Sequence, residues 1–452
     1  MWACRQFANR SRVLLSQLRP IHRVVLAGAS RGHASEAIDG DRHVAKHAAA
    51  SAVRFHGADR TNLLDAMKKK KHMYLVLDDT NNGITVHKLD VDGGGDPSGD
   101  ALERLPNPPV IRMESPSLGD NPVVAIVGSN IIGVGTGSPD PLSDYELRDG
   151  VTVAFDTKTA VLTVLRDLPV DLRDNPVEFA VAAGNWLYML EGGGSSRNYY
   201  YGWSYRGEEF CPGGLHCLKV EDSVDVDDAT RSKQDSVGCW YHLRSPSRCL
   251  WSDGTSGIPM YAGNITGHAL DPEGYAFFLS VNGYCTTNDK RCRGTFSYDG
   301  ATGDWTRHGD WQLPFGGQAH YDNDLGVWIG LHYNYGSEHT DGYLCSCTVP
   351  SLGAEDEPEP KWKLIGNEKL FLEDPERHLQ AKLVPMGGGG RFCLVEILTR
   401  DRVDVENYEH LGDGDKCVLR LATFRVKSGD DGELVVTERR SAGSYKLSRA
   451  AP

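Results

Sequence analysis

The densest group of side chains with chemical potential lies between Arg307 and Asp322. The segments Arg307-His-Gly-Asp-Trp311 and Gln318-Ala-His-Tyr-Asp322 place two histidines and two aspartates within sixteen residues. Histidine beside carboxylate can act as a general acid–base pair or bind a metal ion, provided that the side chains converge. His308 and His320 fall in different predicted repeats, so hydrogen bonds between neighbouring repeats explain them more simply. The sequence therefore predicts no catalytic residue and no metal site here.

A second candidate group is aromatic. Residues 197–205 combine four tyrosines and one tryptophan with Arg197, and Arg206 follows directly. Arginine, tyrosine and tryptophan are enriched at the hot spots of protein interfaces. We therefore predict that this segment binds a protein partner; the alternative is a long hairpin tip that packs on its own sheet. The candidate binding residues are Arg197, Tyr199, Tyr200, Tyr201, Trp203 and Tyr205.

The eleven cysteines do not form a metal-binding pattern. Pairs such as Cys211/Cys217 and Cys345/Cys347 lack the Cys-x-x-Cys spacing of zinc sites. Cys345 and Cys347 lie two residues apart in a predicted strand, so both side chains point to one face, which suits packing. Reduced thiols are expected, including Cys285 and Cys292. No cofactor is expected.

These groups are embedded in a chain of repeated β-strands. Residues 293–314 alternate, break at Asp299-Gly-Ala-Thr-Gly303 and resume, which predicts two strands joined by a glycine-containing turn. Similar units begin near residues 123, 179, 267, 317 and 379, most of them 50 to 62 residues apart. Four antiparallel strands at about this period are the signature of a β-propeller.

The predicted fold is all-β, a single kelch-like β-propeller with six four-stranded blades, and seven blades are the alternative. Residues 73–89 and 101–105 supply most of one blade, and the C-terminal region 441–448 is expected to add its missing strand and close the ring. Aromatic residues on third and fourth strands are predicted to pack between blades, and aspartates to open the turns between these strands. These residues are Tyr298, Phe155, Trp305 and Trp362, and Asp156 and Asp299.

Charge and composition divide the chain. The net charge is −14, and residues 1–35 hold six arginines without an acidic residue, which leaves −20 for the remainder. An acidic body argues against nucleic acid as a partner. No apolar run approaches the roughly 20 residues of a membrane helix, so no membrane span is expected. A monomer is expected.

Three regions follow along the chain. Residues 1–35 have the arginine-rich, acid-free profile of an organellar transit peptide, and the alternative is a disordered basic leader without import function. Mitochondrial localisation is predicted, with chloroplast or cytoplasmic/nuclear localisation as alternatives. Residues 36–70 form a polar linker, and 71–448 form the propeller, with a long insertion at 192–262.

The block Asp304-Trp-Thr-Arg-His-Gly-Asp-Trp-Gln-Leu-Pro-Phe315, followed by Gly317-Gln-Ala-His-Tyr-Asp322, resembles a plant family of uncharacterised proteins that is expanded in grasses. Gly342-Tyr-Leu-Cys-Ser-Cys347, Leu75-Val-Leu-Asp78 and Leu105-Pro-Asn-Pro-Pro109 extend the resemblance to about residues 70–448. The family is similar to kelch propellers and has no established activity to carry over. The insertion and the arginine-rich leader depart from it.

The favoured function is a non-enzymatic protein-interaction module that binds partners through propeller loops, since no catalytic set assembles. Deleting residues 192–236 is expected to leave a folded ring without its partners. The alternative is an enzyme or small-ligand binder that uses the central channel, with His268 and His320 pointing inward. An apolar or Gly/Ala-lined channel would argue against this alternative, and converging histidines and carboxylates would favour it.

Overall fold

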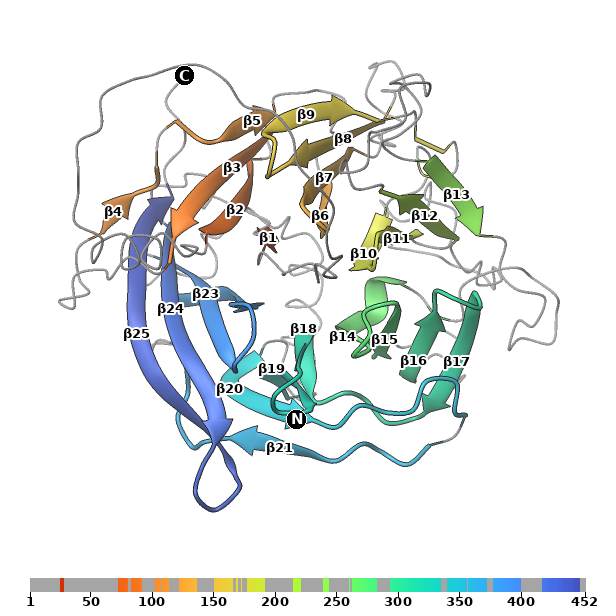
Figure 1. The fold of residues 1–452 in the computed structure, drawn as a ribbon, viewed down its shortest axis with the longest axis vertical. Coiled ribbons are helices and arrows are strands. Elements are labelled where there is room, and N and C mark those ends of the chain that lie inside the picture. The colour runs from red at the N-terminus through yellow and green to blue at the C-terminus, as the bar shows by residue number, and fades with distance from the viewer. Residues whose placement is uncertain are drawn as a thin grey trace, which may run out of the picture.

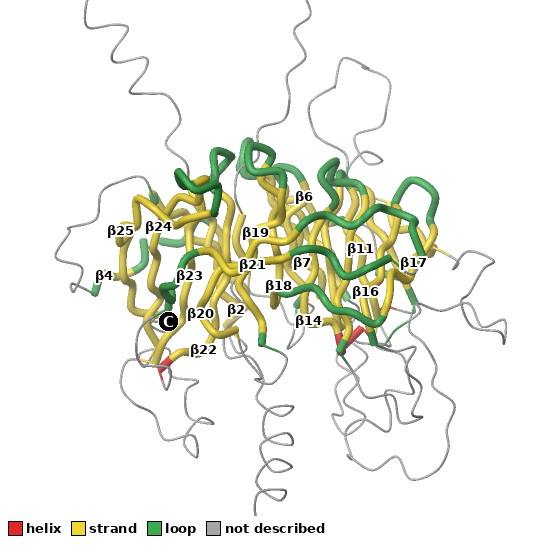
Figure 2. Tube along the Cα trace, turned by 90° about the horizontal axis from the view of Figure 1, so that it is seen from below, coloured by secondary structure: helices red, strands yellow, loops and turns green. Residues whose placement is uncertain are grey.

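The protein is a β-propeller. In the computed structural model, β-sheets surround a common centre, with strands β1, β6, β10, β14 and β18 near it (Figure 1). Viewed from the side, the strands run between two ends of the ring that carry the loops (Figure 2). The structure describes residues 25–27, 72–79, 83–91, 102–106, 108–113, 122–135, 150–165, 168–169, 172, 177–191, 214–220, 239–243, 260, 262–282, 293–334, 340–355, 357–371, 377–399 and 417–447.

The described strands form five hydrogen-bonded sheets, and the first three have four strands each. The first contains β1 (Val25–Ala27), β2 (His72–Asp79), β3 (Gly83–Asp90) and β5 (Ile111–Met113). The second contains β6 (Val123–Val127), β7 (Asn130–Gly135), β8 (Val151–Asp156) and β9 (Val161–Val164). The third contains β10 (Val177–Ala183), β11 (Trp186–Glu191), β12 (Leu215–Lys219) and β13 (Cys239–Leu243).

The fourth sheet has eight strands because two antiparallel meanders join through their first strands. One meander contains β14 (Ile265–Leu270), β15 (Ala276–Val281), β16 (Gly294–Asp299) and β17 (Asp304–Gly309). The other contains β18 (Phe315–Asp322), β19 (Val327–Tyr333), β20 (Thr340–Cys347) and β21 (Trp362–Ile365). β14 and β18 pair in parallel over residues 267–269 and 317–319. The hairpin predicted within 293–314 is confirmed as β16 and β17.

The fifth sheet contains β22 (His378–Pro385), β23 (Arg391–Thr399), β24 (Cys417–Ser428), β25 (Leu434–Leu447) and β4 (Glu103–Arg104). Closure of the ring by the C-terminal strand is not confirmed, because β25 pairs with β24 and not with the strands at 72–90. β1 is the edge strand of the first sheet that lies toward the centre of the ring, and it pairs with β2 (Figure 1). β4, expected in that sheet, instead pairs in parallel with β25. The number of blades stays a prediction.

The turns between third and fourth strands follow the predicted aspartate chemistry. Asp156 Oδ1 accepts the N–H of Lys158 at 3.0 Å, and Asp299 Oδ1 accepts the N–H of Ala301 at 2.8 Å. Gly303, which ends the second of these turns, has a φ of 80°, a conformation that favours glycine. The aspartate side chains thus make the local hydrogen bonds that the sequence predicts, and Thr157 of the first turn also donates to the Ser129 carbonyl at 2.8 Å.

Apolar clusters lie between neighbouring sheets, because alternating strand residues point to both faces of each sheet. Phe277 of β15, for example, packs with Tyr188 of β11, and Tyr298 lies against the same tyrosine at 5.4 Å. One cluster joins the first sheet to the last: Leu75 and Leu89 pack with Val395 and Leu419. The sheets at the two ends of the described chain are therefore packed against each other.

Trp362 differs from the prediction. Instead of packing between sheets, its side chain is 40% exposed and stacks on His332 of its own sheet, with ring centroids 5.4 Å apart. Tyr298 and Phe155 are buried as predicted, in clusters that span two sheets. Cys345 and Cys347 are also buried, both in one cluster, as their two-residue spacing predicts.

In the described part of the chain, no helix is long and apolar enough to cross a membrane. Residues 1–35 and 36–70 lie outside the described residues except for β1. Cys285 and Cys292 also lie outside them.

Candidate functional site

The predicted binding residues of segment 197–205 lie outside the described residues, but the base of the loop that carries them is described. The loop leaves β11 at Glu191 and returns at Gly214. The Glu191 N–H donates to the Gly214 carbonyl at 3.1 Å, and the Gly214 N–H donates to Glu191 Oε1 at 2.7 Å. His216 Nε2 lies 3.2 Å from Glu191 Oε2, and its side chain is fully buried. The loop therefore starts from a closed, hydrogen-bonded base.

The insertion at 192–262 is not one continuous loop. β12 and β13 divide it into three segments, and β12 contributes Leu215, Cys217 and Leu218 to the buried clusters. Deleting residues 192–236 would remove β12 with these core side chains, so the expectation that a folded ring would remain is wrong. The part between Glu191 and Gly214 can be shortened without loss of a described strand.

Two further histidines pair with carboxylates toward the corresponding end of their own sheets. His332 Nδ1, near the end of β19, lies 2.7 Å from Asp341 Oδ2 near the start of β20. His378 Nδ1, at the start of β22, lies 3.2 Å from Glu396 Oε1 on β23. A propeller repeats its sheets by rotation, so equivalent strand ends share one side of the ring. We call this side, marked by His216, His332 and His378, the histidine rim.

The pair on the last sheet is extended by an arginine. Arg420 Nη2 lies 2.5 Å from Oε2 of Glu396, whose side chain has no exposed surface. Phe371 stacks on the His378 ring with centroids 4.1 Å apart. A carboxylate removed from water needs such partners, because burial of an unpaired charge costs several kcal/mol. Sequence reasoning missed this group, although a single glutamate in the apolar run 392–398 was an available signal.

The histidines of the 307–322 block serve structural roles. His308 Nε2 lies 2.8 Å from Ser297 Oγ, a distance suitable for a nucleophile and its base. Ser297 and His308 are 1% and 0% exposed, however, so no substrate can reach them. His320 Nε2 donates to the Leu383 carbonyl of the next sheet at 2.9 Å, and Asp322 Oδ2 accepts the Gly390 N–H at 2.8 Å. The predicted hydrogen bonding between repeats is confirmed for His320 and Asp322, whereas His308 bonds within its own sheet.

His268 and His320 share one face of the first strands. His268 is opposite Gln318 in the parallel pair, and His320 follows two residues later on the same face. Burial lowers the pKa of His268 to about 3, and the neighbouring His320 and Lys382 lower it further. Burial also lowers the pKa of His320 to about 4, against the opposing effect of its hydrogen bond to Leu383. Both rings are therefore neutral at physiological pH.

This inner group is polar but has the wrong chemistry for a general base. Among the described residues, the charged group that acts on His268 is Lys382, and no carboxylate acts on either ring. Without a carboxylate the rings have no partner to raise their basicity, so they are suited to hydrogen bonding and not to proton abstraction at neutral pH. Among the described residues, no group of three or more metal-ligating side chains forms.

The described cysteines do not provide a nucleophile. Burial raises the pKa of Cys217, Cys347 and Cys393 to about 12 each, so their thiols stay protonated. The thiolate is the reactive form of cysteine. Each of these side chains is at most 1% exposed, which further separates them from any substrate.

Residues 70–445 match a family described as "Protein of unknown function (DUF1668)". The chain belongs to this family. The match spans the strands from β2 to β24 and most of β25, and it confirms membership of a family of unknown function. No curated protein matches the sequence.

Comparison with solved structures finds low overall similarity. The chain is similar to the periplasmic gluconolactonase PpgL of Pseudomonas aeruginosa, at 12% identity and a TM-score of 0.38, over 80% of this chain and 79% of that one. It is also similar to an α-L-arabinofuranosidase of Clostridium thermocellum, at 11% identity and a TM-score of 0.32, over 72% of this chain and 95% of that one. With the Dos1 propeller it shares 11% identity and a TM-score of 0.30, over 82% of this chain and 74% of that one.

Proposed function

We propose that this DUF1668 chain is a non-enzymatic protein-interaction module that binds a protein partner through loops on the histidine rim. The contact residues are those of segment 197–205, with Arg197, Tyr199 and Trp203 among them. The observation that carries the proposal is the closed base formed by Glu191, Gly214 and His216. It holds the two ends of an aromatic- and arginine-containing loop at one fixed point of the rim, and this restraint lowers the entropy lost when the loop binds.

The described polar groups favour binding over catalysis. The Ser297–His308 pair is buried, the inner histidines are neutral without a carboxylate partner, and the described thiols are protonated. Each arrangement has a structural explanation in packing or hydrogen bonding. Recognition through loops on a rigid scaffold requires none of these groups to react.

The test is partner capture with three forms of the full chain. In the first variant, residues 194–211 are replaced by a short Gly/Ser linker, which leaves Glu191, Gly214 and β12 intact. In the second, Tyr199, Tyr200, Tyr201, Trp203 and Tyr205 become serine. Partners captured from grass tissue by the wild type should be lost by both variants, while near-ultraviolet circular dichroism stays native. Unchanged capture by the folded serine variant would exclude segment 197–205 as the contact.

A small-ligand site in the central channel is the second candidate. The polar residues His268, Gln318, His320 and Lys382, on the first strands β14, β18 and β22, support it. Polar donors of this kind can hold a ligand by hydrogen bonds without reacting with it. Replacing Gln318 with Leu would abolish ligand binding if the channel is the site and leave partner capture unchanged.

We also propose mitochondrial import directed by residues 1–35, with the grass-family resemblance making plant cells the relevant host. A fusion of residues 1–40 to a fluorescent reporter tests it, and a diffuse cytosolic signal would contradict it. β1 adds a consequence, because Val25–Ala27 pairs with β2. Removal of a leader that includes these residues would leave the backbone of β2 without that neighbour, and faster amide exchange at residues 74–76 would report it.

A further inference from the structure

A cavity of about 110 Å³ lies where the interface between the first and last sheets ends. This volume accommodates several water molecules, or one small polyatomic ion. Val91 of the first sheet's side and Met386 of the last sheet are buried where they line it. Phe392 and Phe424 also line it, and their rings belong to the apolar cluster on the opposite face of the last sheet. The remaining lining residues are polar: Arg391, Thr423, Arg425, Glu438, Arg440 and Ser441.

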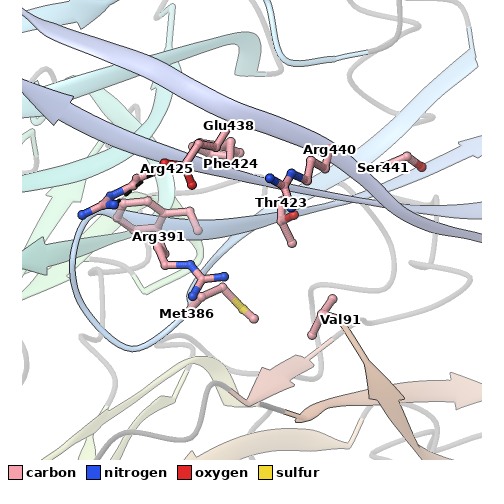
Figure 3. Close-up of a pocket in the computed structure, with 10 residues that line it drawn as sticks. Val91, Met386, Arg391, Thr423, Phe424, Arg425, Glu438, Arg440 and Ser441 are labelled. Atoms are coloured by element: carbon pink, nitrogen blue, oxygen red, sulfur yellow. Dashed lines mark ion pairs between the residues drawn. The ribbon is translucent and has the colours of Figure 1, made fainter. Parts of the chain in front are cut away.

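Strand register places three guanidinium groups around this cavity. Arg391 on β23 is directly opposite Arg425 on β24, and Thr423 is directly opposite Arg440 on β25. Residues 423 and 425 lie on one face of β24, because side chains alternate along a strand. Figure 3 shows the three arginines on neighbouring strands around the cavity. Like charges directly opposite each other on one face of a sheet repel, and an anion bound between them would reduce that repulsion.

The lining is cationic in an acidic protein. Among the described residues that line the cavity, Glu438 is the one carboxylate, against three arginines. Its Oε1 lies 3.8 Å from Arg425 Nη1, and the two side chains are 52% and 43% exposed, so solvent screens this pair. The whole chain has a net charge of −14. Clustering of arginines here therefore runs against the average charge of the protein.

The geometry also fixes one arginine in place. Arg425 Nε donates to the Gly389 carbonyl at 2.8 Å, which holds the side chain against the hairpin between β22 and β23. A guanidinium held by its Nε still presents its terminal N–H groups, which match the oxygens of a phosphoryl group.

We propose that this cavity binds the phosphoryl group of a small soluble molecule, with Arg391, Arg425 and Arg440 as ligands. Thr423 and Ser441 supply hydroxyl donors at the same wall. The site is separate from segment 197–205 and does not depend on it. It requires no reaction, only the exchange of bound water for an oxyanion.

Calorimetric titration of the full chain with inorganic phosphate, in chloride buffer of constant ionic strength, tests the proposal. Wild type should bind one phosphate saturably. Arg440→Gln should weaken binding about tenfold or more, the loss expected for a charge-assisted hydrogen bond. Arg293→Gln, an exposed arginine before β16, is the control with the same change of charge and should bind as wild type does. Circular dichroism verifies that each variant is folded.

Two results would overturn the proposal: no saturable binding by the wild type, or equal weakening by Arg293→Gln and Arg440→Gln. The chain itself offers one competitor, since Asp92, Asp96 and Asp100 follow Val91 in the sequence. If only a variant with these three aspartates changed to asparagine binds phosphate, an internal carboxylate occupies the cavity and the external ligand is excluded. Replacement of residues 194–211 should leave phosphate binding intact, which separates this test from that of partner binding.

Discussion

Two interfaces solve the same packing problem in different ways: one joins the two meanders of the fourth sheet, and the other joins the first sheet to the last. Between β14–β15 and β18–β20 the contact is aromatic, with Phe278 and Trp328 rings 5.2 Å apart. Trp328 Nε1 also donates to the Leu270 carbonyl across the interface at 2.7 Å, and the first strands pair in parallel. Between β2–β3 and β22–β25 the contact is mainly aliphatic. The arginine-lined cavity lies at the edge of this contact.

The two interfaces differ in how far a change of side chain would disturb the packing between them. The aromatic interface is closed by both side chains and backbone hydrogen bonds, so a change there must disturb packing. At the aliphatic interface, Leu419 and Leu421 are buried on the face of β24 that continues to Thr423 and Arg425. Val91 and Met386 belong to this apolar contact and also line the cavity, so the arginines begin where the apolar contact ends.

The largest expected effect is in the aromatic interface. Phe278→Ala should lower the free energy of unfolding by about 3–5 kcal/mol, because the ring has no exposed surface and its removal leaves a cavity. Urea denaturation followed by tryptophan fluorescence measures the change. Trp362→Ala, at a position 40% exposed, is the control and should cost about 1 kcal/mol or less. Equal losses in the two variants would contradict the assigned difference in packing.

The second-largest effect should be a loss of stability in acid that arises at the histidines of the first strands. The pKa values of His268 and His320 lie at about 3 and about 4 in the folded state, below the usual value of 6.5. Folding thus favours the neutral rings, and their contribution is complete above pH 6.5 and lost as the pH falls toward 4. Each ring should therefore make the free energy of unfolding about 2 kcal/mol lower at pH 5 than at pH 7.

His320→Gln should reduce this loss, because the amide keeps a donor for the Leu383 carbonyl but does not titrate. Urea denaturation at pH 7 and pH 5 measures the two free energies. Arg440→Gln is the matched control in the other interface and should show the wild-type loss, since arginine stays charged at both pH values. A wild-type loss in His320→Gln would show that other groups cause the acid sensitivity.

Much of the fold could be predicted because its signals are local. The turn aspartates Asp156 and Asp299, the alternation within 293–314 and the spacing of Cys345 and Cys347 each depend on a few neighbouring residues. The pairing of β14 with β18 joins residues 50 positions apart through backbone groups alone, so no side-chain pattern indicates it. The same holds for β1, whose three residues pair with β2 from within a segment predicted to be a leader.

The cavity could not be predicted for a related reason. Arg391, Arg425 and Arg440 are ordinary strand residues in the sequence, and only the register of three strands places them around one volume. The histidine rim has the same origin, because Glu191 and His216 are separated by the insertion and meet through strand pairing. Segment 197–205 was found instead from composition, which depends on no register.

The smallest expected effect concerns the one carboxylate of the arginine-lined cavity. Glu438→Gln should lower the free energy of unfolding by less than about 1 kcal/mol, because its pair with Arg425 is long and solvent-exposed. The same change should tighten phosphate binding several-fold by removing a negative charge beside the cavity. Glu433→Gln, which breaks an exposed pair with Lys363 away from the cavity, is the control and should leave phosphate affinity unchanged. Weaker phosphate binding by Glu438→Gln would mean that Glu438 orients Arg425 for the anion, and that the cationic surplus alone does not create the site.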